Sequence, residues 1–213
     1  MMQVTAGRER RPAEPAERIE KGRMIMNIVP TVKINGEAYT DIFSTLLDQR
    51  NVMVQGTITS ELAMTVNAQL LYLASKNDDP IELYIDSPGG SITAGLSIID
   101  MMNHIKPEVI TICCGTAASM GAVIFSAGAK GKRYMLPHSE CMIHQPSTGF
   151  EGKESDIRII ADYISRKKRE LVDILSENCK QDREKVEKDI EADNYMTAEE
   201  SVEYGLADKI LDA

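Results

Sequence analysis

Short apolar runs alternate with amphipathic stretches along most of the chain. Runs at 51–55, 81–85 and 109–114 have the length and composition of buried strands. The stretches between them, at 60–75 and 92–105, repeat apolar side chains at helical spacing. The repeated positions are Leu62, Val66, Leu70 and Leu73, then Ile92, Leu96, Ile99 and Met102. Strand–helix units of this length predict an α/β fold with a parallel sheet and right-handed crossovers.

The second half of the chain continues this alternation. It predicts a buried helix at 118–129, a short strand at 139–143 and a charged amphipathic helix at 153–177. Two helix starts carry capping residues, which are Ser60 with Glu61 and the capping box of Thr197 with Glu200.

The 213 residues suffice for one domain, which we expect from Ile28 onward. The first 27 residues differ, because residues 1–23 hold six Lys or Arg, four Glu and two Pro but almost no large apolar side chains. We expect 1–27 to be a disordered tail or a propeptide, or alternatively a basic arm that contacts a partner.

Charge and cysteine content exclude several classes of protein. The net charge of −9 argues against a nucleic-acid-binding surface and a polybasic membrane anchor. No apolar run approaches the roughly 18 residues of a membrane-spanning helix. The four cysteines, Cys113, Cys114, Cys141 and Cys179, have no CxxC spacing. We therefore expect reduced thiols in a cytoplasmic protein, with neither a disulfide framework nor a metal site.

Ser119 is the first candidate for a reactive group. It follows the run at 109–114 and lies among the small residues of 115–122. Small neighbours would let a substrate carbonyl approach, and free N–H groups at the start of the next helix could stabilise an oxyanion. The alternative interpretation is a small-residue helix packed tightly on the sheet, with Ser119 as a packing residue.

A serine nucleophile needs a general base, and the chain has three histidines. His104 lies near the end of an amphipathic helix, and His138 lies in a polar turn. His144 ends a predicted strand, where ligands gather in open α/β sheets. We therefore predict His144 as the base.

A carboxylate that orients the imidazole would complete a triad. Asp193 ranks first, because it lies beside apolar residues in a loop expected between helices and could be partly buried. Asp189 is expected to be solvated, and Asp86 is a further candidate. The order Ser119, His144, Asp193 differs from the triad orders of α/β-hydrolases and of chymotrypsin-type and subtilisin-type proteases.

The turn Ser-Pro-Gly-Gly at 87–90 connects a predicted strand to a helix. Its glycines would let backbone N–H groups come close to a ligand. It could be an oxyanion hole, a phosphate cradle or a plain tight turn, and no Gly-Lys-Ser/Thr supports a phosphate-binding P-loop. Beside a serine nucleophile, the oxyanion hole is favoured.

Five stretches together resemble the ClpP family, the proteolytic subunits of Clp proteases. They lie at 84–95, 117–122, 127–134, 142–146 and 202–206. The resemblance implies a crotonase-like spiral of βαβ units with a protruding helix–strand handle. It also implies the site residues, which are the nucleophile Ser119, the base His144, the acid Asp193 and the oxyanion-hole amides of Gly90 and Met120.

The same resemblance implies a serine endopeptidase that works through an acyl-enzyme and needs no cofactor. Family members form two stacked heptameric rings around a chamber, and AAA+ unfoldases feed unfolded proteins into it. The apolar docking pockets for that ATPase would be formed by Tyr84, Ile112, Tyr134, Leu136 and Leu211.

Several positions depart from the family's pattern. Ala192, preceded by Glu191, stands where an Arg that pairs across the rings usually precedes the triad acid. Glu82 and His104 stand where docking pockets commonly have aromatic residues, and the axial-loop stretch at 29–41 is a few residues short. We therefore expect a divergent paralogue with altered unfoldase docking.

Two other functions stay open. One is a weakly active or non-catalytic ring subunit that assembles with an active paralogue, which Ala192 favours. The other is a crotonase-type acyl-CoA enzyme, which would also use backbone amides as an oxyanion hole but needs no Ser–His pair. The presence of all three triad residue types favours an active peptidase.

Overall fold

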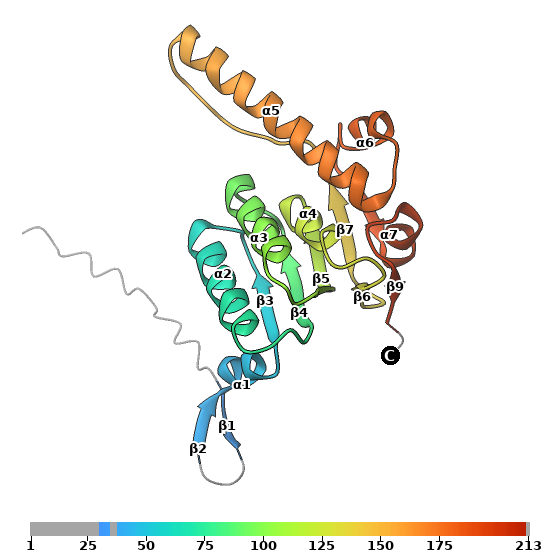
Figure 1. The fold of residues 1–213 in the computed structure, drawn as a ribbon. Coiled ribbons are helices and arrows are strands. Elements are labelled where there is room, and N and C mark those ends of the chain that lie inside the picture. The colour runs from blue at the N-terminus through green and yellow to red at the C-terminus, as the bar shows by residue number, and fades with distance from the viewer. Residues whose placement is uncertain (1–29, 35–37, 212–213) are drawn as a thin grey trace, which may run out of the picture.

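A mostly parallel seven-stranded sheet forms the centre of the fold (Figure 1). The computed structural model describes residues 30–34 and 38–211, so the predicted tail at 1–27 lies outside the described residues. The strands of the sheet are β3 (Asn51–Gln55), β4 (Ile81–Ser87), β5 (Val109–Ala118), β6 (Arg133–Met135), β7 (Glu140–Ile143), β8 (Asn194–Thr197) and β9 (Lys209–Ile210). Their order is β3–β4–β5–β6–β9, and β5 also pairs with β7, which pairs with β8. Only the β7–β8 pair of this described sheet is antiparallel.

A two-stranded hairpin, β1 (Thr31–Ile34) with β2 (Ala38–Asp41), precedes the sheet. The helices of the described chain are α1 (Ile42–Asp48), α2 (Ser60–Ala74), α3 (Ile92–His104), α4 (Met120–Ser126), α5 (Glu154–Cys179), α6 (Arg183–Asp189) and α7 (Ala198–Tyr204). Within residues 30–34 and 38–211, no helix is long and apolar enough to cross a membrane.

The predicted α/β fold with a parallel sheet is confirmed, and the first units lie close to their expected bounds. The cap of α2 differs: the Thr59 side chain accepts from the Leu62 N–H, and Ser60 is the first helical residue. The capping box of α7 is confirmed, because Thr197 and Glu200 bond each other's backbone N–H.

The helix predicted at 118–129 is too long at both ends. β5 continues to Ala118 because its last residues pair with β7, so α4 begins two residues later. The helix ends at Ser126 because the chain turns back along β5 there. A Cβ at Gly128 would lie 2.2 Å from Thr111 Oγ1, so this return depends on glycine.

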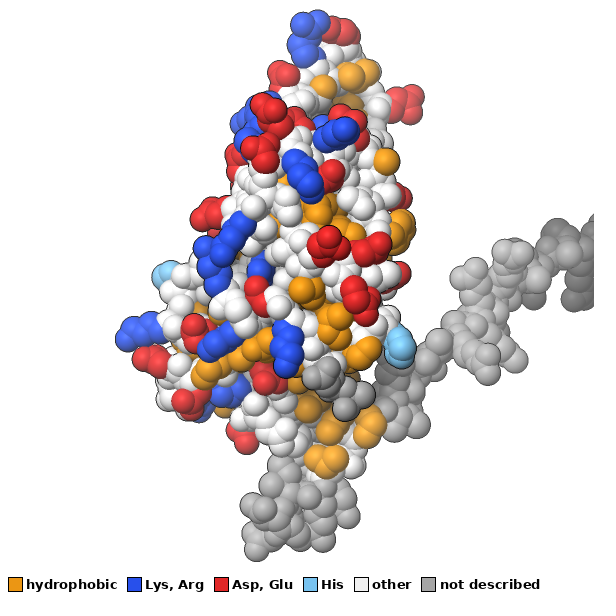
Figure 2. Space-filling view, turned by 90° about the vertical axis from the view of Figure 1, so that its right-hand side faces the viewer, with side chains coloured by type: hydrophobic (Ala, Val, Ile, Leu, Met, Phe, Trp, Pro, Cys, Tyr) orange, Lys and Arg blue, Asp and Glu red, His pale blue; other side chains and the backbone are white. Residues whose placement is uncertain are grey.

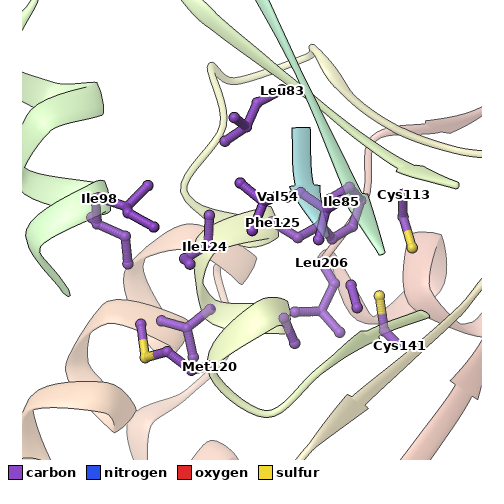
Figure 3. Packing of buried hydrophobic residues seen from close by; sticks show 14 of the residues in the cluster. Val54, Leu83, Ile85, Ile98, Cys113, Met120, Ile124, Phe125, Cys141 and Leu206 are labelled. Atoms are coloured by element: carbon purple, nitrogen blue, oxygen red, sulfur yellow. The ribbon is translucent and has the colours of Figure 1, made fainter. Parts of the chain in front are cut away.

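Helices α2, α3 and α4 cover one face of the sheet (Figure 1). Burial alternates along β4, whose Ile81, Leu83 and Ile85 are fully buried while Glu82 and Tyr84 on the other face are half-buried. Figure 3 shows Ile124 and Phe125 of α4 packed in this core. The core therefore seats α4, and with it the preceding Ser119, directly on the sheet.

Helix α5 projects from the sheet as the predicted handle (Figure 1). Its buried side chains lie near its C-terminal end, at Leu171, Val172, Leu175 and Cys179. Farther out, Ile157 and Ile159 are exposed, and Figure 2 shows charged side chains of both signs interspersed over this upper part. The strand expected in the handle is not formed. A strand needs a neighbouring edge, and within the described residues no strand pairs with 144–153.

A buried arginine ties the C-terminal elements to the sheet. Arg133 on β6 bonds both carboxylate oxygens of Asp208, with Nη2 2.5 Å from Oδ1 and Nε 2.9 Å from Oδ2. Its Nη1 also donates to Asn178 O in α5, at 3.0 Å, and to Gly205 O after α7, at 2.8 Å. Burial alone would raise the pKa of Asp208, but the hydrogen bonds from Arg133 outweigh it and lower that pKa.

Replacing Arg133 with Met should therefore lower the free energy of unfolding by about 3 kcal/mol, because a partly buried carboxylate and two helix-end carbonyls lose their partner. Urea unfolding at pH 7 measures this loss. Arg158→Ala removes an exposed pair with Glu154 on α5 and should leave the midpoint nearly unchanged. Equal unfolding midpoints for Arg133→Met and wild type would contradict the stabilising role of Arg133.

The same pair predicts a pH dependence. Because the folded-state pKa of Asp208 is lowered, its stabilising contribution is present above its ordinary pKa of 3.8 and is lost as pH falls through the folded-state pKa. The difference in unfolding free energy between wild type and Asp208→Asn should therefore shrink below pH 4. A difference in unfolding free energy that stays constant down to pH 2 would contradict a stabilising role of the ionised Asp208.

Candidate active site

Three strand ends meet at one edge of the sheet and carry the three predicted triad residues. β5 and β7 are parallel, with Ala118 opposite Met142, so Ser119 and His144 follow their carboxyl ends. β8 is antiparallel to β7, with Asn194 opposite Ile143. Asp193 therefore precedes β8 at that same edge.

The three side chains form a continuous hydrogen-bond chain. Ser119 Oγ lies 2.8 Å from His144 Nε2, and His144 Nδ1 lies 2.9 Å from Asp193 Oδ1. A carboxylate accepts, so Nδ1 carries the proton and Nε2 is left to accept from the serine hydroxyl. This is the tautomer that a general base for Ser119 requires.

The surroundings of Asp193 differ from those expected. It lies between α6 and β8 rather than between two helices, and its side chain is 59% exposed rather than partly buried. Asp189, which was expected to be solvated, is the more buried carboxylate and bonds Tyr204 and Lys185. The Tyr204 hydroxyl that bonds Asp189 comes from α7, 15 residues away, so the charged sequence around Asp189 does not reveal its burial.

The other candidates from the sequence lie outside this hydrogen-bond chain. Asp86 accepts from the Thr116 N–H at 3.1 Å. His104 is the exposed last residue of α3, and His138 is exposed in the turn before β7. The structure brings together Ser119, His144 and Asp193.

The backbone of Ser119, the candidate nucleophile, is strained. Its φ of 54° is in the left-handed region, which costs a non-glycine residue about 1–3 kcal/mol. The conformation is held because its N–H donates to Met142 O at 2.7 Å and α4 begins at the next residue. The hydroxyl is thereby turned out of the strand toward His144.

The 87–90 turn packs directly against Ser119. At Gly89, with φ of 94°, a Cβ would lie 2.7 Å from Ser119 Cβ and 2.8 Å from Ala118 O. At Gly90, with φ of 151°, it would lie 2.4 Å from Ile58 O. Both positions therefore require glycine. Ile58 pairs with Gly90 in a β-bridge and so supports the turn. Its aliphatic side chain gives no sign of this role in the sequence.

Two residues that line this site have backbone N–H groups without a hydrogen-bond partner among the described residues. Gly89 N–H donates to Ser87 Oγ, whereas the amides of Gly90 and Met120 donate to no group in the described residues. Gly90, Met120, Ser119 and His144 all line one cavity of about 70 Å³. Its remaining walls are mostly apolar: Ile92, Val123, Ile143, Pro146, Ser147, Leu171, Leu175 and Ile190.

A comparison with known protein families matches residues 34–213 to the Clp protease family. The match spans all but the first 33 residues. The chain belongs to the Clp protease family. The family is one of peptidases, which agrees with a serine hydroxyl bonded to a histidine beside a cavity at one sheet edge.

The five residues that the Clp protease resemblance points to for ATPase docking gather on the sheet face away from α2–α4. Tyr84, Ile112 and Tyr134 are direct cross-strand neighbours on β4, β5 and β6. Leu136 and Leu211 follow β6 and β9, held by bonds to Cys113 O and Met135 O. Burial and a hydrogen bond to Glu82 raise the pKa of Tyr84 to about 12, so the ring stays neutral.

The thiols of this family member stand apart from the triad. All four cysteines are free, and the sulfur atoms of Cys113 and Cys141 face each other in the core (Figure 3). Burial raises the pKa of Cys179 to about 12. Within residues 30–34 and 38–211, no group of three or more His, Cys, Asp or Glu is arranged to hold a metal ion.

The close contact of the turn with Ser119 gives a matched test. Gly89→Ala must displace the backbone beside the nucleophile, and a misplacement of about 1 Å costs on the order of 10²-fold in rate. Labelling of Ser119 by a fluorophosphonate probe should slow by that order. Gly131→Ala, also at positive φ but with nothing within 4 Å, should lose only about 1 kcal/mol of stability and keep its labelling rate. Equal labelling of both variants would refute the tight-packing argument.

Proposed function

We propose that the protein is a serine endopeptidase that cleaves unfolded polypeptides through an acyl-enzyme. The observation that carries the proposal is the Asp193–His144–Ser119 hydrogen-bond chain, which ends in a cavity with two free backbone amides. Membership of a peptidase family supports it.

In the proposed mechanism, His144 Nε2 takes the Ser119 proton as Oγ attacks the substrate carbonyl carbon. The carbonyl oxygen becomes an oxyanion that accepts from the Gly90 and Met120 amides. Asp193 holds Nδ1–H and stabilises the imidazolium. His144 then protonates the leaving amine, which departs and leaves an ester on Ser119. A water molecule, deprotonated by His144, hydrolyses that ester and restores the serine.

The family also suggests the setting in which such a site would work. Clp proteases generally form ring oligomers with Clp ATPases. We propose two stacked heptameric rings in the cytoplasm, fed by an AAA+ unfoldase that docks on Tyr84, Ile112, Tyr134, Leu136 and Leu211. Enclosure in such rings would keep folded proteins away from the site and admit unfolded chains.

The hydrogen-bonded triad favours an active peptidase over the two other functions. A non-catalytic ring subunit needs no hydroxyl within 2.8 Å of a base that is itself oriented by a carboxylate. A crotonase-type acyl-CoA enzyme would use the free amides but not the Ser119–His144 pair.

Removing the nucleophile tests the proposal. Ser119→Ala should lower hydrolysis of a fluorogenic peptide by at least about 10⁴-fold and abolish fluorophosphonate labelling. Ser165→Ala, which removes an exposed hydroxyl on α5, is the control and should leave both unchanged. An assembled wild-type protein that takes no label on Ser119 would instead favour the non-catalytic subunit. Retained hydrolysis by Ser119→Ala would revive the acyl-CoA alternative.

The apolar side chains that line part of the cavity predict which peptides are cleaved. Its walls would bury the side chain that precedes the scissile bond, so peptides with Leu there should exceed Ala in kcat/KM by at least about tenfold. Glu there should be the poorest, because its carboxylate would be desolvated without a partner. Comparison of three otherwise identical peptides measures this order, and equal rates would show that the cavity does not hold the side chain.

A further inference from the structure

The loop that carries Asp193 is bonded to the residue after His144. The backbone N–H of Gln145 donates to Ile190 O at 2.6 Å, and its side-chain Nε2 donates to Glu191 O at 2.9 Å. Two consecutive carbonyls of the loop therefore accept from one residue.

These bonds close a small ring through the triad. His144 is joined covalently to Gln145, and Gln145 is bonded to Glu191. Two residues later, Asp193 is bonded back to His144 Nδ1 at 2.9 Å. The position of the Asp193 carboxylate relative to the His144 imidazole is therefore set by the Gln145–Glu191 bond and the two short chain segments that it connects.

Asp193 has little else to hold it. Its side chain is 59% exposed, and its bond to His144 is the one side-chain hydrogen bond it makes within residues 30–34 and 38–211. Glu191 and Ala192 are also exposed. Ile190 is buried and Asn194 pairs with Ile143, so the loop is fixed at both ends and depends on Gln145 between them.

We propose that Gln145 is a positioning residue for the triad. Its side-chain amide holds the Glu191 carbonyl and thereby keeps Asp193 where it orients His144. The inference rests on the proposed serine-peptidase function. Gln145 acts through Asp193 and touches none of the reacting atoms, so its loss reduces the catalytic step rather than substrate binding.

Gln145→Ala should lower kcat for peptide hydrolysis about three- to tenfold, the equivalent of one net hydrogen bond, and leave KM within about twofold. Gln145→Glu keeps the length but offers no N–H donor, and it should lose at least as much. Gln181→Ala is the matched control, because Gln181 Nε2 makes the same kind of bond to Tyr204 O at 2.7 Å, away from the triad. It should keep kcat within about twofold.

A double-mutant cycle separates positioning from a general structural effect. With Asp193 replaced by Ala there is no carboxylate to position, so Gln145→Ala should then change kcat less than about twofold. If residual hydrolysis is too slow, the rate of fluorophosphonate labelling of Ser119 supplies the same comparison. An equal fold-loss in both backgrounds, or a rise in KM at unchanged kcat, overturns the inference.

Hydrogen–deuterium exchange does not depend on catalysis, so it tests the role of Gln145 separately from the proposed function. Hydrogen–deuterium exchange of the Glu191 amide, which donates to Lys188 O at 3.2 Å, should rise in Gln145→Ala and Gln145→Glu but not in Gln181→Ala. If Ser119→Ala keeps full hydrolysis, the proposed function fails whatever the exchange shows. If wild type depends on Ser119 but neither exchange nor kcat changes in the Gln145 variants, only the role of Gln145 fails.

Discussion

β5 changes neighbours halfway along its length, and the candidate active site depends on that change. One side of β5 pairs with β4 before and after a bulge, and the other side pairs first with β6 and then with β7. Between the two, β4 advances two residues, from Ile85 to Ser87, while β5 advances four, from Cys113 to Ala117. The extra residues form a bulge that turns the strand. The Asp86 carboxylate fills the bend, and a Cβ on Gly115 would lie only 2.5 Å from its Oδ1.

The consequence of the bulge is that β5 ends beside a histidine. Without it, Ser119 would continue along β6, a three-residue strand that ends at Met135. With it, β5 runs on beside β7, whose next residue is His144, and the Ser119 N–H reaches Met142 O. The strain at Ser119 and the tight glycine contacts follow from this arrangement, because the 87–90 turn leaves β4 at the level where β5 has just turned.

Local patterning predicted those parts of the fold whose burial repeats within one element. The helices at α2 and α3 and the strands β3 and β4 belong to this group. β6 was not predicted, because a buried charge, Arg133, opens it and finds its partner 75 residues away at Asp208. α6 was missed because only Val186 of its residues is buried. The extension of β5 to Ala118 is also a tertiary effect, since small residues there have weak strand preference and β7 supplies the pairing.

Asp193 bonds His144 because of strand register, which the local sequence does not reveal. From the sequence, Asp193 can be preferred to the other carboxylates only by expecting it to be partly buried. In the structure, however, Asp189 is the more buried of the two. What selects Asp193 is the register of β8, in which Met196 is opposite Cys141 and buried while Tyr195 is exposed. A slip of one residue would turn Tyr195 into the core and Met196 out to solvent. Burying Tyr195 and exposing Met196 would cost free energy, and this cost fixes the register of β8. That register places Asp193 beside the His144 imidazole. An apolar side chain three residues away thus holds Asp193 beside His144, so the carboxylate that bonds the imidazole is the exposed Asp193 and not the more buried Asp189.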